Sequence, residues 1–221
     1  MHVRTFTYIS DAKVDMLLDQ IPSGVKQTIA AELGFNFGLF SGKVGSEKQT
    51  LETRVQRLLA VEQHLRQAET LGTPAAPASW IEGVMSMSWI DAGAGCLLCI
   101  GGDDTRLLAL AGSMKHIAGA AAPEATPIPF SFFPSIAAHL TAMTEKKLTQ
   151  LDGLHGRLLD VALAPGLSQG AMGWAEALTW LRASQATVSQ DVRFIARRLV
   201  QQSCAGIDVL LASPLFVELV E

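Results

Sequence analysis

Residues 81–111 read IEGVMSMSWIDAGAGCLLCIGGDDTRLLALA, and this stretch decides the fold class. Apolar or small residues recur at every second position from 81 to 89, the period of a strand with one buried face. Turn residues at 91–95 and 101–104 separate this segment from apolar runs at 96–100 and 107–111. The stretch therefore predicts an antiparallel meander of three strands.

Further strands and helices are predicted on both sides of this meander. Strands are expected at residues 3–9, 35–39, 209–212 and 215–219, and helices at 11–21, 24–33, 47–71, 134–148, 174–182 and 189–202. Residues 151–170 follow no clear pattern and are left unassigned. We expect a single α+β domain over residues 1–221, with a largely antiparallel sheet and helices packed against it.

The composition narrows the classes of function. Of the 221 residues, 49% are hydrophobic and 17% are charged, as in a well-packed globular protein. A net charge of −4 disfavours binding to duplex nucleic acid, which favours a basic face. No apolar run reaches the ~18 residues of a membrane helix, and no signal peptide is seen. We therefore expect a cytoplasmic protein with no membrane partner.

The three cysteines do not predict a metal site or a disulfide. Cys96 and Cys99 have the spacing of a zinc half-site, but the chain lacks a second pair of cysteines. On a strand, residues three apart face opposite sides, so the two thiols would diverge. Nucleotide-binding glycine motifs are absent as well, and no cofactor is predicted.

The first polar cluster, residues 10–15, lies where a predicted strand ends and a helix begins. Asp11 and Asp15 are four residues apart, so both carboxylates could lie on one helix face and hold a divalent metal. The simpler interpretation is that Asp11 caps the helix and Asp15 complements its dipole.

The second cluster, residues 112–119, leads from the third meander strand into a short helical turn. Lys115 and His116 would stand at the positive end of that turn, which is unfavourable unless an anion binds there. Alternatively, the turn is short and exposed, and its dipole has little effect. Because both clusters follow strands, we expect them to lie near each other.

Several segments resemble an uncharacterised bacterial family that is known only as a domain of unknown function. They are YISDAKVDML at 8–17, GSMKH at 112–116, FIARRL at 194–199 and SPLFV at 213–217, so the resemblance spans nearly the whole chain. The family usually has tyrosine where Phe216 stands. The resemblance implies a loose association with bacterial defence systems and assigns no catalytic residue.

These observations predict a non-enzymatic cytoplasmic sensor or adaptor that binds a small anionic ligand, such as a nucleotide, or a partner protein. The predicted binding residues are Ser10, Asp11, Lys13, Ser113, Lys115 and His116. Lys115 and His116 would hold the anion, while Asp11 and Lys13 would orient it or pair with each other.

Two alternatives remain open. One is a metal-dependent phosphodiester hydrolase or nuclease that uses Asp11, Asp15 and His116, with Asp103 or Asp104 as a further ligand. The other is a structural subunit of a complex. A homodimer is compatible with the amphipathic helices.

Overall fold

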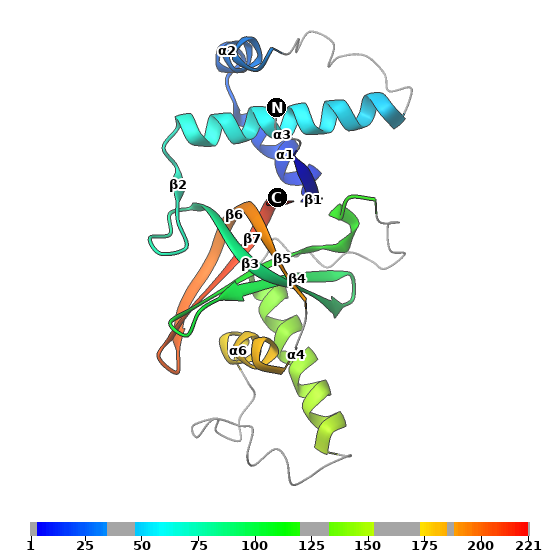
Figure 1. Ribbon diagram of the computed structural model, residues 1–221, viewed down its shortest axis with the longest axis vertical. Coiled ribbons are helices and arrows are strands. Elements are labelled where there is room, and N and C mark those ends of the chain that lie inside the picture. The colour runs from blue at the N-terminus through cyan, green and yellow to red at the C-terminus, as the bar shows by residue number, and fades with distance from the viewer. Residues whose placement is uncertain (1–3, 35–46, 120–132, 153–172, 185–187, 221) are drawn as a thin grey trace.

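A computed structural model describes residues 4–34, 47–119, 133–152, 173–184 and 188–220 (Figure 1). Its elements, in chain order, are β1 (Thr5–Ile9), α1 (Asp11–Gln20), α2 (Ser23–Leu33), α3 (Glu47–Gln67), β2 (Leu71–Gly72), β3 (Trp80–Gly93), β4 (Cys96–Gly102), β5 (Arg106–Ser113), η2 (Met114–His116), α4 (Phe133–Asp152), α6 (Trp174–Ser184), β6 (Ser189–Cys204) and β7 (Ile207–Leu219). The fold is mixed α+β, as predicted. Among the described residues, no helix is both long and apolar enough to cross a bilayer.

The sheet closes into a small barrel. β3, β4 and β5 form the predicted antiparallel meander, and β7 then joins β5 in parallel. β6 closes the ring because it pairs antiparallel with β7 on one edge and with β3 on the other. Counted along the chain, the third and fifth strands of this ring are therefore parallel neighbours, an order shared with OB-fold barrels.

Two short strands extend the barrel. β1 pairs antiparallel with the end of β7, and β2 pairs in parallel with the start of β3. Five of the seven strand pairings are thus antiparallel and two are parallel. The prediction described a sheet with helices against it and did not include closure.

Three apolar layers result from the period-two alternation of the strands. Side chains such as Cys99, Leu108 and Phe194 fill the barrel interior. Leu98, Leu107 and Leu211, each next in the chain to an interior residue, face outward and pack with α4 and α6. On the other side of the barrel, a third layer joins α1 and α3 to β6 and β7 (Figure 1).

Cys96 and Cys99 occupy different layers, as expected for residues three apart on a strand. Cys96 packs in the layer of α4 and α6, whereas Cys99 lies in the barrel interior. Burial raises the pKa of each thiol to about 12, so both remain protonated at neutral pH.

The helix predicted at residues 189–202 is wrong, because this segment forms the long strand β6. Val192, Phe194 and Ala196 alternate into the barrel interior, while Ile195 faces the layer of α1 and α3. When both faces of a strand are buried, its apolar residues also fit a helical period, and periodicity alone cannot separate the two. The strand predicted at 35–39 lies outside the described residues.

Candidate functional site

The chain leaves β1 and enters α1 at a bulge in β7. Ile195 pairs with Phe216 and Ala196 with Pro214, so Leu215 is the extra residue on β7. The Leu215 carbonyl accepts a hydrogen bond from the Ser10 N–H at 2.8 Å. A bulge re-aims the backbone of its strand, and here it fixes the start of α1.

Lys13, in the first turn of α1, is buried with only 7% of its surface exposed. Its Nζ donates to Ser10 Oγ at 3.3 Å and to the Pro214 carbonyl at 3.1 Å. Burial, assisted by the positive charge of Arg197, lowers its pKa to about 8. No carboxylate pairs with Lys13 within the described ranges, so the alternative in which it pairs with Asp11 is wrong.

Asp11 instead joins α1 to α3 and to η2. Its Oδ1 accepts from Arg54 Nε at 2.6 Å, and Arg54 Nη2 also donates to the Ile9 carbonyl at 2.8 Å. His116 Nδ1 lies 3.8 Å from Asp11 Oδ2. Partial burial would raise the pKa of Asp11, but the interactions with His116 and Arg54 outweigh it and hold that pKa below its ordinary value.

The second polar cluster, residues 112–119, follows β5 and lies beside the first cluster. Tyr8 of β1 forms an isolated bridge with Ile117, and the Ala118 N–H donates to the Thr7 carbonyl at 2.9 Å. The prediction that the two junctions lie close together is therefore confirmed. His116 is 8% exposed and lies edge-on to the Tyr8 ring, with centroids 5.7 Å apart.

Ser113 and Lys115 lie at the rim of this arrangement. The Ser113 side chain accepts a hydrogen bond from the Lys115 backbone N–H at 3.4 Å, which caps η2. The Lys115 side chain is exposed. His116, which was predicted to hold a bound anion, faces the carboxylate of Asp11.

Tyr8 contacts both polar clusters. It is 1% exposed, and burial raises its pKa above the ordinary value although hydrogen bonds to the Ser113 backbone and the Ser10 side chain oppose that rise. A Cβ on Gly112 would lie only 2.8 Å from Tyr8 Cζ and closer still to the hydroxyl. Position 112 therefore requires glycine so that β5 can approach Tyr8.

A serine and a lysine three residues apart at a helix start could act as nucleophile and base. Ser10, however, is 2% exposed and Tyr8 beside it 1%. In addition, Lys13 Nζ donates to Ser10 Oγ, the reverse of the direction in which a general base would act. The chain of contacts from Tyr8 through Ser10 to Lys13 instead ties α1 to β5 and β7.

The carboxylates proposed as metal ligands are dispersed. Asp11 pairs with Arg54 and Asp15 with Arg57, both on α3. Asp103 lies at the β4–β5 turn beside α6, on the other side of the barrel from α1 (Figure 1). The described part of the chain contains no group of three or more acidic, histidine or cysteine residues placed to hold a metal ion.

Sequence reasoning missed the arginines of this region. Arg54 lies on a helix that looked like a simple amphipathic one, and no local signal pointed to its contact with Asp11. Arg197 lies in the FIARRL segment at 194–199, but its electrostatic effect on Lys13 follows from the pairing of β6 with Ser213 of β7. Such an effect depends on strand register.

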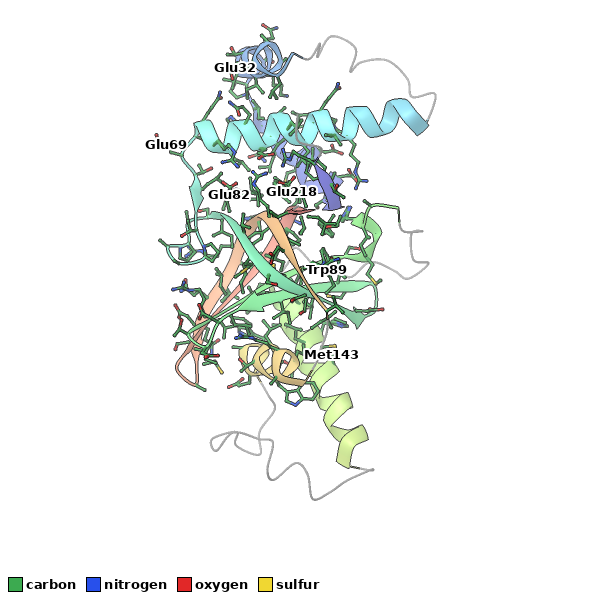
Figure 2. The ribbon with its side chains drawn as sticks, viewed as in Figure 1. Glu32, Glu69, Glu82, Trp89, Met143 and Glu218 are labelled. Atoms are coloured by element: carbon green, nitrogen blue, oxygen red, sulfur yellow. The ribbon has the colours of Figure 1, made fainter. Side chains whose placement is uncertain are left out.

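A second charged cluster, also missed, joins α3 to the barrel (Figure 2). It contains three arginines and three glutamates: Arg4, Arg66, Arg193, Glu62, Glu82 and Glu218. Arg193 contacts all three glutamates, among them Glu218 at 2.5 Å. Each carboxylate has at least two arginine partners, so this cluster is internally neutralised.

The segments that carry the family resemblance meet at this site: Tyr8, Ser10 and Lys13 from the first, Gly112 and His116 from the second, and Pro214 from the last. The chain matches the model of a "Family of unknown function (DUF7019)" over residues 4–221. No curated protein and no solved structure matches it. Bacterial origin and an association with defence remain predictions. The chain belongs to DUF7019, a family of unknown function.

Proposed function

We propose that this chain is a non-enzymatic binding module that takes a small anion of the phosphate class between Lys13 and Arg197. The observation that carries the proposal is a buried ammonium group whose two hydrogen-bond partners are neutral. Burying a cation without a counter-ion is costly. An incoming anion would remove that cost, so the site is prepared for negative charge.

Arg197 adds to this preference. Its side chain is exposed, and it has no ion pair or hydrogen bond with any other described residue. Burial is the main cause of the lowered pKa of Lys13, and repulsion from the positive charge of Arg197 adds to it. Lys13 also has three N–H donors, and two of them are used by partners in the part of the chain that the structure describes. One donor and the Arg197 guanidinium remain for a ligand.

The other predicted residues take supporting places in the proposal. Ser10 positions Lys13, and the contacts of Asp11 with Arg54 and His116 hold the start of α1. Ser113 and Lys115 are at the rim, where Lys115 could contact a larger ligand such as a nucleotide. We propose that the module serves as a cytoplasmic sensor or adaptor, and that ligand occupancy is its signal.

The hydrolase alternative has less support. Both aspartates proposed as metal ligands already pair with arginines of α3, which would have to be displaced for a metal to bind. The OB-fold comparison does not favour nucleic acid either. Such barrels bind oligonucleotides across their second and third strands, and here α4 and α6 cover the outer face of β4 and β5.

Calorimetric titration with inorganic phosphate, AMP and a cyclic dinucleotide tests the proposal. Lys13→Met and Arg197→Gln should each weaken binding roughly 10- to 150-fold, the effect of losing one charge-assisted hydrogen bond. Arg198→Gln is the matched control, because Arg198 is a neighbouring exposed arginine that contacts the Pro77 carbonyl. It should bind as the wild type does.

Chromatography of the titrated samples separates the alternatives. Recovery of unchanged nucleotide supports a binding module, whereas metal-dependent turnover that is lost in Asp11→Asn would establish the hydrolase. Binding that is equally strong in Lys13→Met and wild type would refute the proposed site. If none of the three anions produces heat, the structural-subunit interpretation takes its place.

A further inference from the structure

A groove of about 230 Å³ lies at the border of α6. This helix lies on the other side of the barrel from α1 (Figure 1). β3 contributes Ser86, Ser88 and Ile90 to its lining, and β4 contributes Ile100, Gly101 and Gly102. Leu181 and Arg182 of α6 and Ser189 of β6 complete it. None of these residues belongs to the site proposed above.

The groove exists because the outer face of β3 changes character along the strand. Ile90 belongs to the apolar layer that packs against α6, whereas Ser88 and Ser86, the next outward-facing positions, carry hydroxyls. Leu181 of α6 is buried over this face, as are Ile90 and Ile100. The accessible lining of the groove is therefore supplied largely by hydroxyl groups and Arg182.

The polar groups of the rim are available to a ligand. In the described ranges, the side chains of Ser86, Ser88 and Ser189 have no hydrogen-bond partner. Arg182 is held in place, because Nη1 donates to the Asp103 carbonyl at 2.5 Å and Nη2 to the Gly102 carbonyl at 3.0 Å. Its remaining N–H groups have no acceptor among the described residues.

The electrostatics of the groove disfavour a simple anion site. Arg182 lies in the last turn of α6, where the negative end of the helix dipole offsets its charge. The two hydrogen bonds that Arg182 donates to Asp103 and Gly102 both go to backbone carbonyl oxygens. The exposed carboxylates of Asp103, on the β4–β5 turn, and Asp191, on β6, lie on neighbouring elements. Hydroxyl groups, not net charge, therefore decide what the groove can recognise.

We infer that this groove binds a small polyhydroxylated molecule of about monosaccharide size. Its volume is below the roughly 300–1,000 Å³ of pockets that accept drug-sized ligands. Ring hydroxyls can exchange hydrogen bonds with the serines and with the remaining N–H groups of Arg182. This ligand would act independently of the anion proposed at Lys13.

A two-dimensional NMR titration of the full chain with methyl α-D-glucopyranoside tests this inference. Saturable shifts are expected at the backbone amides of Ser86, Ser88, Gly101 and Ser189. Ser88→Ala should weaken the apparent affinity roughly two- to tenfold, as expected for the loss of one neutral hydrogen bond. The double variant Ser86→Ala/Ser88→Ala should weaken it further.

Ser203→Ala serves as the control, since Ser203 is an exposed serine of β6 outside the groove. It should titrate as the wild type does. The inference is overturned if the sugar gives no saturable shift at the groove, or if the double serine variant binds equally well. It is also overturned if inorganic phosphate shifts these amides and the sugar does not.

Discussion

Lys13 shows how a single residue can define a candidate site. Its position one turn into α1 was readable from the sequence, and so was its proximity to Ser10. Its burial was not, because that depends on the bulge at Leu215, which brings the Pro214 carbonyl to the ammonium group. The same dependence on register explains why Arg197 could not be placed from the sequence.

The lowered pKa of Lys13 predicts an unusual dependence of stability on pH. Its folded value is about 8 and its ordinary value 10.5. Between these values the folded chain has lost a proton that the unfolded chain still binds, so this residue's contribution to stability grows as pH rises. Across this pH range Lys13 should raise the free energy of unfolding by about 3 kcal/mol. The Lys13→Met variant should lack this rise.

The measurement is the free energy of unfolding of wild type and Lys13→Met in urea at several pH values from about 8 upward. The quantity compared is the difference between the two proteins. The pKa values of Tyr8 and of the buried cysteines are raised, so these groups lower the stability as the pH becomes alkaline. Wild type and Lys13→Met share this effect, and it cancels in the difference. A difference that stays constant with pH would contradict the prediction, and Lys115→Met should follow wild type.

At the scale of elements, period-two alternation predicted the meander correctly, and apolar spacing predicted α1, α2 and α3 well. The interpretation of Asp11 as the cap of α1 was wrong, because the N-cap is Ser10, whose side chain makes no capping hydrogen bond. Alternation failed at β6, because residues 194–196 are consecutively buried and the strand carries three arginines that also suit a helix. The charged cluster beneath α3 could not be predicted either. Its members come from α3, β3, β6, β7 and Arg4 next to β1, and on each element they resemble ordinary surface charges.

The close approach of β5 to Tyr8 predicts that Gly112→Ala is destabilising. The added Cβ would lie 2.8 Å from Tyr8 Cζ, and Tyr8 is held on all sides in the barrel interior. Overpacking of this kind costs about 1–3 kcal/mol. In a Tyr8→Phe background, which lacks the hydroxyl, part of this loss should be recovered.

Thermal or urea unfolding of the four proteins in this double-mutant cycle gives the coupling between the two positions. Gly24→Ala is the matched control, since a Cβ there meets nothing within 4 Å in helix α2. That substitution should leave stability unchanged or raise it by a few tenths of a kcal/mol. If Gly112→Ala were as harmless as the control, the close approach would be refuted.

At the scale of the whole molecule, closure of the barrel depends on β7. This strand pairs with β1, β5 and β6, and its residues 209–217 are all buried. The apolar character of 209–219 predicted that the segment belongs to the core. Its place between β5 and β6 could not be predicted, because pairing between strands distant in sequence leaves no local signal.

Truncation after Gly206 should therefore abolish cooperative folding. Each buried apolar side chain of β7 contributes about 1.5–3 kcal/mol, and losing several of them exceeds the 5–15 kcal/mol by which a typical domain is stable. The truncated chain should show no cooperative thermal transition by circular dichroism and should be recovered mainly as aggregate. A soluble, cooperatively melting truncation product would contradict this.

The pairing of Thr5 with Leu219 has a consequence for biosynthesis. Of the described strands, β1 leaves the ribosome first, and it can pair with β7 only after that strand has emerged. At about 5–20 residues per second, this interval is roughly 10–40 s. During this time β1 and the meander lack the strand that joins them, and nascent chains would depend on chaperones or on the tunnel exit to keep these edges from pairing elsewhere.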